Sequence, residues 1–182
     1  MNKIFSAAIA LVCASLFCSC TVNSVRPLPG GAAPSAQRAV LVYGVQLEGS
    51  WAYQGFPLQL AEYDLAKQNI SGDCFRFNRT EASVPPVAGT VRYFAFDVPA
   101  GYYVLSPFQT VRLSGDTQAF EVPAGSSIYA GDFILGKDQT LRLQRDAAPT
   151  TSITTALPDL KQPLQLAKTV VVKPPSAFLC TP

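Results

Sequence analysis

Short stretches in which apolar and polar residues alternate run through most of this chain, and turn residues separate them. The first strong stretch, 39–47, is apolar on both faces for most of its length, which predicts a central strand. A six-residue phrase then occurs twice, as Phe-Asp-Val-Pro-Ala-Gly at 96–101 and as Phe-Glu-Val-Pro-Ala-Gly at 120–125. In each copy, proline and glycine favour a tight turn after the alternating residues. The pattern therefore predicts two antiparallel hairpins.

Further alternating stretches surround these two hairpins. We expect strands at 58–64, 74–78, 140–145 and 168–173, and at most one short helix near 150–157. The predicted fold class is all-β, an antiparallel β-sandwich.

The register at the two turns has alternatives. In a bulged turn after the first copy, Tyr102 and Val104 share the core face of the preceding strand, whereas a two-residue turn substitutes Tyr103 and Leu105. All four side chains are apolar enough that the first copy does not distinguish these registers. The second copy favours the bulged form, because only that form gathers one apolar face from Phe120, Val122, Ile128 and Ala130. We take the bulged form for both turns.

The N-terminal residues have the pattern of an export signal. A short positive region, 1–3, precedes an apolar run over 4–17 that is too short to span a membrane comfortably. The run ends in Leu-Phe-Cys-Ser-Cys at 16–20, which resembles the lipobox of bacterial lipoproteins. That resemblance implies that Cys20 receives diacylglycerol and that, in a Gram-negative cell, the protein is sorted to the outer membrane. An ordinary secretory signal without lipid is the alternative.

The chain then divides into three parts. Residues 1–19 are the expected signal peptide with its lipobox, and 20–38 are the lipidated cysteine and a flexible tether rich in Pro, Gly and Ala. Residues 39–182 are the expected β-sandwich domain with a C-terminal strand and tail. We expect the protein in the cell envelope, lipid-anchored to the outer membrane and facing the periplasm or the cell surface.

Two cysteines, Cys74 and Cys180, remain after maturation at Cys20. In an exported domain they most simply form a disulfide. It closes a loop of about a hundred residues, for which the entropy model gives about 4–5 kcal/mol. Two buried free thiols are the alternative. Neither cysteine is expected to be catalytic, because the chain has no histidine to activate a thiolate.

The stretch 39–145 is similar to uncharacterised bacterial lipoproteins with an immunoglobulin-like or prealbumin-like β-sandwich. The similarity rests on the repeated apolar-x-apolar-Pro-x-Gly turn and on the Tyr-Ala-Gly-Asp-Phe strand at 129–133. It implies the fold and the envelope location, and it brings no activity with it.

Composition argues against most catalytic and nucleic-acid functions. Among 182 residues, 48% are apolar, 14% are charged and the net charge is +2, with the basic residues scattered, so no nucleic-acid partner is expected. Histidine is absent, and no nucleophile elbow, phosphate loop, zinc spacing or calcium loop occurs. We therefore predict that the protein is not an enzyme and has no metal and no cofactor.

We consider three carboxylates as candidates for chemistry, and only one of them stands at an unusual position. Asp97 and Glu121 are equivalent in the two repeats, and we interpret them as solvated surface residues rather than as a catalytic pair. Asp132 follows Gly131 inside an apolar strand, where we expect it to hydrogen-bond backbone across a bulge. A ligand or metal role for Asp132 is the alternative.

A glycine-flanked loop provides the best candidate binding surface, through Trp51, Tyr53 and Phe56. Planar side chains on a loop stack on sugars or on a partner protein, although they also plug the end of a sandwich. The favoured function is a non-enzymatic scaffold or protein-interaction module, and the alternative is a module that binds a glycan or another small ligand through this loop. The expected partners are the membrane, through the lipid at Cys20, and another envelope protein or a cell-wall glycan.

Overall fold

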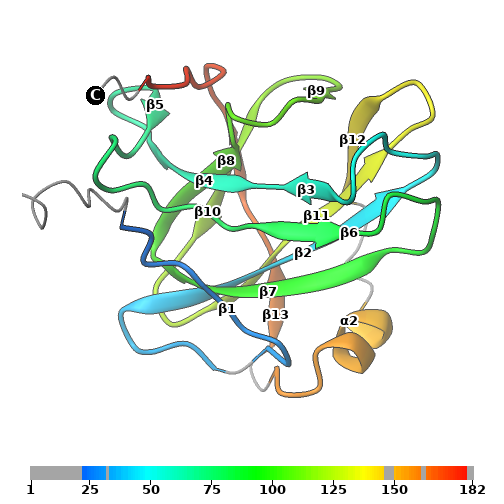
Figure 1. Ribbon diagram of the computed structural model, residues 1–182. Coiled ribbons are helices and arrows are strands. Elements are labelled where there is room, and N and C mark those ends of the chain that lie inside the picture. Colours follow the sequence, from blue (N-terminus) through cyan, green and yellow to red (C-terminus); the bar gives the residue numbers. More distant parts are fainter. Residues whose placement is uncertain (1–21, 32, 146–149, 161–162, 180–182) are drawn as a thin grey trace, which may run out of the picture.

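The computed structural model describes residues 22–31, 33–145, 150–160 and 163–179 (Figure 1). The predicted signal peptide and Cys20 lie outside these residues, as does Cys180. The elements follow in chain order: β1 (Arg26–Pro27), β2 (Arg38–Leu47), β3 (Phe56–Leu58), β4 (Leu60–Asp64), β5 (Asn69–Ile70), β6 (Ala82–Val84), β7 (Arg92–Pro99), β8 (Gly101–Leu105), β9 (Arg112–Leu113), β10 (Gln118–Val122), β11 (Ser127–Leu135), β12 (Thr140–Gln144), α2 (Thr150–Ala156), β13 (Leu164–Leu166) and β14 (Thr169–Val171).

The strands form two main sheets that pack as a sandwich. The larger sheet has the order β1-β7-β2-β11-β12-β9, with β13 added beside β11, and the smaller has the order β14-β10-β8-β4-β5. Strands β3 and β6 form a separate two-stranded ribbon. The predicted all-β sandwich with one short helix is confirmed. Three pairs in the larger sheet, β2–β11, β11–β13 and β12–β9, are parallel exceptions among antiparallel neighbours.

Strand β2 is central, as its sequence predicts. It lies between β7 and β11, and all its residues except Arg38 and Gln46 are buried. Tyr43 and its inward neighbours belong to the core between the sheets. Val40 and Val42 point to the opposite face, where Ile153 and Leu157 at helix α2 cover them. A helix on the outer face of the sheet thus explains why β2 is apolar on both sides.

Aromatic rings dominate the core around Tyr43. Its ring stacks on Phe96 at 5.5 Å between centroids and meets Phe133 edge-on at 5.9 Å. The Tyr43 hydroxyl, which is also buried, donates to Oγ1 of Thr80 at 2.9 Å. Thr80 Oγ1 in turn accepts the backbone N–H of Leu60 at 3.0 Å. A hydrogen-bonded tyrosine therefore ties β2 to the loop that precedes β6 and to β4.

The two Pro-Ala-Gly corners are not hairpins, and this prediction is wrong. Strand β7 belongs to the larger sheet and β8 to the smaller, while β10 belongs to the smaller sheet and β11 to the larger. Each corner therefore carries the chain from one sheet to the other, as in sandwiches whose strands switch sheets at a bend. Proline and glycine specify that the chain turns, but they do not specify which strand pairs with which.

The prediction of which side chains face the core is correct at the second corner and wrong at the first. Four side chains of the second corner all enter the core between the sheets, as predicted: Phe120, Val122, Ile128 and Ala130. At the first corner, Tyr103 enters that core, whereas Val104 lies in a separate cluster on the outer face of the smaller sheet. The bulged register predicted for the first corner is therefore wrong.

The segment interpreted as a flexible tether is part of the folded body from Val22 onward. Strand β1 pairs with β7, and the side chain of Val25 is buried in the main core. Arg38 fixes the segment from the other side, because its Nη2 donates to the carbonyl of Ser24 at 2.8 Å while its Nε pairs with Asp97 at 2.8 Å. The interpretation as a tether rests on the lack of a periodic pattern of apolar residues in this segment. That interpretation is wrong from Val22 onward, since a strand can pair with a sheet edge through its backbone alone.

The C-terminal part joins the two sheets. Strand β13 pairs with β11 in the larger sheet and β14 pairs with β10 in the smaller. Arg145 holds the connection: its guanidinium donates to the carbonyls of Ala130 and Ala167 and to Oγ1 of Thr169, and it lies over the ring of Phe120. Within the described residues, no helix has the length and apolar character needed to cross a bilayer.

Candidate functional site

The loop that joins β2 to β3 borders an open groove at the protein surface. This groove has a volume of about 620 Å³. Trp51, Tyr53, Gly55 and Pro57 form one side, and the residues before β9 and in the turn before β12 form the other: Thr110, Val111 and Gln139. Three segments far apart in the sequence therefore meet at this end of the sandwich, on the right in Figure 1.

Trp51 is held in place by contacts on several sides. Its backbone N–H donates to the carbonyl of Pro86 at 2.9 Å. Its ring meets Phe56 edge-on at 5.1 Å and lies 5.8 Å from the ring of Tyr53. The indole Nε1 is buried without a hydrogen-bond partner, while the Tyr53 side chain is 73% exposed. The groove therefore presents one fixed ring and one exposed ring.

Phe56 is not part of this surface. It is fully buried, pairs with Val84 across the β3–β6 ribbon and supports the Trp51 ring from the core side. Of the three predicted binding residues, Trp51 and Tyr53 line the groove, whereas Phe56 lies in the core behind Trp51. The alternation of the sequence already contains the reason, because Phe56 and Leu58 share one face of a strand whose other face carries Pro57.

The chemistry of the groove suits an uncharged ligand. None of its lining residues is ionisable except Tyr53, and Thr110 and Gln139 add a hydroxyl and an amide to the two aromatic rings. Its volume falls in the range of about 300–1,000 Å³ that small-molecule sites occupy. Thr110, Val111 and Gln139 could not be predicted from sequence, because only the folded arrangement of distant turns brings them to Trp51.

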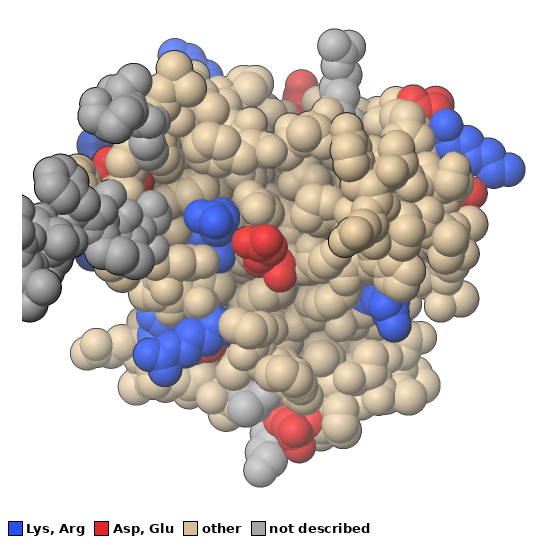
Figure 2. All heavy atoms as spheres, viewed as in Figure 1, with Lys and Arg blue, Asp and Glu red and all other residues tan. Residues whose placement is uncertain are grey.

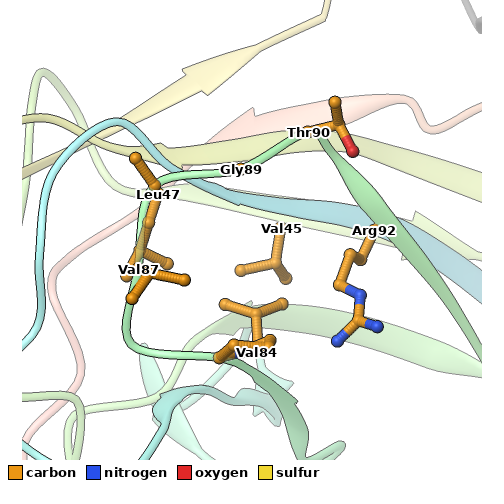
Figure 3. Close-up of a pocket in the computed structure, with 9 residues that line it drawn as sticks. Val45, Leu47, Val84, Val87, Gly89, Thr90 and Arg92 are labelled. Carbon is orange, nitrogen blue, oxygen red and sulfur yellow. The ribbon is translucent and has the colours of Figure 1, made fainter.

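A second, smaller hollow of about 160 Å³ lies under the loop that leads into β7 (Figure 3). Val45, Leu47, Val84 and Val87 form its apolar walls, and the Arg92 side chain extends along one side. The volume is below that of ordinary ligand sites. We regard it as a packing defect beside the β3–β6 ribbon rather than as a site.

Asp132 lies at a bulge, as predicted from Gly131, but its carboxylate interacts with tyrosine hydroxyls rather than with the backbone as expected. The β2–β11 register shifts between Tyr129 and Asp132. A Cβ at Gly44 would collide with Oδ1 of Asp132, so that glycine makes room for the carboxylate. Oδ1 is buried without a hydrogen-bond partner, and the hydroxyls of Tyr93 and Tyr129 interact with the same carboxylate.

Burial changes the pKa values of Asp132 and of the two tyrosines that contact it, Tyr93 and Tyr129. It raises the pKa of the Asp132 carboxyl, and the hydroxyls of Tyr129 and Tyr93 oppose that shift in part. Burial, reinforced by the nearby Asp132 charge, raises the pKa of Tyr93 to about 12 and raises that of Tyr129 further. Both phenols therefore stay protonated at neutral pH, so they donate to the carboxylate and cannot serve as bases.

Asp132→Asn is expected to stabilise the fold at neutral pH and to have progressively less effect in acid. Folding raises the pKa of Asp132. Between the ordinary pKa and the raised one, the folded state therefore binds more protons than the unfolded state. The free energy of unfolding of the wild type thus falls as the pH rises through this range. Below the ordinary pKa both states are protonated and the penalty vanishes. Urea unfolding of the two proteins from pH 3.5 to pH 8 measures this, and a pH-independent difference contradicts it.

Asp97 and Glu121 do not form a pair. Asp97 lies in β7 of the larger sheet and binds Arg38, while Glu121 lies in β10 of the smaller sheet opposite Tyr102. Asp97 is thus a half-buried ion-pair partner, not the freely solvated residue expected from the sequence.

No group of three or more acidic or cysteine ligands able to hold a metal occurs within the described ranges. The predicted disulfide partner Cys180 lies outside them, so the Cys74–Cys180 bond stays a prediction. The surroundings are compatible with it, because Phe178 packs 5.2 Å from Phe77, three residues beyond Cys74. Lipidation of Cys20 likewise stays a prediction.

The fold and the groove together define an all-β sandwich protein with an aromatic surface groove. Comparison with protein-family models, with curated proteins and with solved structures finds no match to this chain.

Proposed function

We propose that this protein is a non-enzymatic lipoprotein of the bacterial cell envelope that binds a glycan in the groove beside Trp51 and Tyr53. The single observation that carries the binding role is the groove itself, in which one fixed and one exposed aromatic ring adjoin a hydroxyl and an amide. Sugar rings have apolar faces that stack on such rings and hydroxyl groups that bond to such polar neighbours. The lipobox-like segment ending at Cys20 supports the envelope location.

The sequence also supports a role without catalysis. General acid–base chemistry most often uses histidine, which the chain lacks. The half-buried Asp132 side chain interacts with two tyrosine hydroxyls that stay protonated at neutral pH, so its carboxylate is a poor base for the activation of a nucleophile.

Titration with oligomers of N-acetylglucosamine is expected to change the fluorescence of Trp51, the only tryptophan of the chain. Tyr53→Ala is expected to weaken binding roughly 5-fold to 150-fold, as the loss of about 1–3 kcal/mol of stacking implies. Tyr53 is exposed, so this change leaves the fold intact. Tyr102→Ala serves as the control, because Tyr102 lies in β8 opposite Tyr63 and does not line the groove, and this variant should bind as the wild type does.

A protein-interaction role is the second candidate, and the edge strand β14 favours it. This strand ends the smaller sheet, and Val170, Val171 and the nearby Leu166 are 45%, 66% and 42% exposed. An exposed edge with apolar side chains can accept an extended segment of another protein. If sugars leave Trp51 fluorescence unchanged while envelope proteins co-purify with the wild type and not with Val171→Lys, this second function replaces the first.

A further inference from the structure

The folded body begins almost immediately after the predicted lipid attachment point. The backbone N–H of Val22 donates to the carbonyl of Phe75 at 2.7 Å, and the N–H of Phe77 donates to the carbonyl of Val22 at 3.1 Å. Cys20 stands only two positions before Val22, a distance of at most about 7 Å of extended chain. A lipid on Cys20 is therefore held near the surface around Val22 and Phe75.

That surface is unusually apolar. Nine large apolar side chains are exposed within the described residues, and four of them gather around Phe77: Val22 (59%), Phe75 (67%), Phe108 (43%) and Leu179 (88%). The rings of Phe108 and Phe178 lie 5.5 and 5.2 Å from that of Phe77, and Leu179 follows Phe178 directly. Scattered apolar residues on a surface are ordinary, but a contiguous group marks a place of contact. We call these four residues the anchor face.

Arginines stand beside the anchor face. Arg76 is exposed and pairs with Val22 through an isolated backbone bridge. Arg79 lies over the ring of Phe77 at 5.3 Å and forms a long ion pair with Glu81 at 3.8 Å. Glu62 and Asp73 lie close to Arg76, so the positive and negative charges beside the anchor face nearly balance. Apolar contact is therefore the main attraction that this surface offers to whatever covers it. Elsewhere the visible surface shows only scattered charges of both signs (Figure 2).

Aromatic and aliphatic side chains flanked by arginine are the composition of a surface that rests at the boundary between lipid headgroups and acyl chains. We propose that the anchor face is seated in the bilayer surface, with Phe75 and Leu179 inserted, so that the lipid and the protein surface attach the domain together. This proposal rests on the lipidation of Cys20 put forward above.

The test uses the full mature lipoprotein in vesicles of phosphatidylethanolamine and phosphatidylglycerol that carry brominated acyl chains. In a Trp51→Phe background, Phe75→Trp provides a reporter on the anchor face. Val171→Trp is the matched control, because Val171 is 66% exposed and lies on β14, at the edge of the smaller sheet opposite β5. We expect blue-shifted emission from Trp at position 75 and loss of most of it to bromine quenching, with neither change at position 171.

The outcomes separate this proposal from the lipid anchor itself. If mass spectrometry shows lipid on Cys20 and the protein floats with vesicles, but position 75 is quenched no more than position 171, the anchor stands and the seated face is overturned. A blue shift at position 75 that requires high protein concentration and shows no quenching assigns the face to a second copy of the chain and also overturns the proposal. If Cys20 carries no lipid, the envelope function fails, and the same two reporters with added vesicles still decide whether the face binds lipid.

Discussion

Replacing Tyr43 by alanine is expected to lower the free energy of unfolding by about 3–5 kcal/mol. Tyr43 is fully buried between the sheets, and its ring contacts Phe96 and Phe133. The change removes these contacts and leaves a cavity that rigid strands on both sides cannot close. It also leaves Thr80 without the hydroxyl that donates to it. Urea unfolding followed by circular dichroism measures the loss.

Tyr43→Phe is the matched control for this prediction. It keeps the ring and removes only the hydroxyl, which donates to Thr80 Oγ1. Because Thr80 still accepts the N–H of Leu60, the expected cost is only about 0.5–1.5 kcal/mol. Equal effects of the two changes would show that the hydrogen bond, and not ring packing, holds this part of the core.

Cys180→Ser is expected to cost about 4–5 kcal/mol, since a disulfide to Cys74 closes a loop of about a hundred residues and restricts the unfolded chain. The described residues before Cys180 lie close to the segment that carries Cys74: Ser176 donates its N–H to Asn69 at 2.9 Å, and Phe178 packs on Phe77. The C-terminal segment thus returns to the loop that carries Cys74. Unfolding of the oxidised wild type and of the variant, followed in parallel, measures the difference.

Reducing agent provides the control for the disulfide. Reduced wild type should be about as unstable as Cys180→Ser, and reduction should leave the variant unchanged. The prediction is contradicted if the oxidised mature wild type has two thiols that react with an alkylating agent after unfolding.

The elements of this fold were largely predictable from sequence, whereas their pairing was not. The uninterrupted apolar run of β2 identified a central strand, and alternation around the second corner identified the inward face of β10, because both patterns are local properties of the sequence. The Pro-Ala-Gly phrase identified the corners. Whether the next strand returns beside its predecessor or crosses to the other sheet depends on strands far away, such as β1 and β4, and no local pattern records it.

The candidate site was predictable to the same extent. Trp51 and Tyr53 stood out because aromatic residues in a glycine-flanked loop are uncommon, and Asp132 stood out because a carboxylate interrupts an apolar strand. Gln139 had no such signal, since a polar residue in a tight turn is ordinary. The anchor face was missed for another reason: Val22 was assigned to a tether, so nothing suggested that it pairs with residues 75–77.

The parallel pairing of β2 with β11 has a consequence for how this protein acquires its structure. Val40 pairs with Ser127, about ninety residues later, and these two strands form the centre of the larger sheet. Closing so long a loop costs conformational entropy before the stabilising contacts between the strands can form. Folds rich in such distant contacts therefore form slowly. The two central strands therefore cannot pair until residues 127–135 have been made. Such a delay is compatible with the export that we propose, because a translocation pore passes unfolded chains.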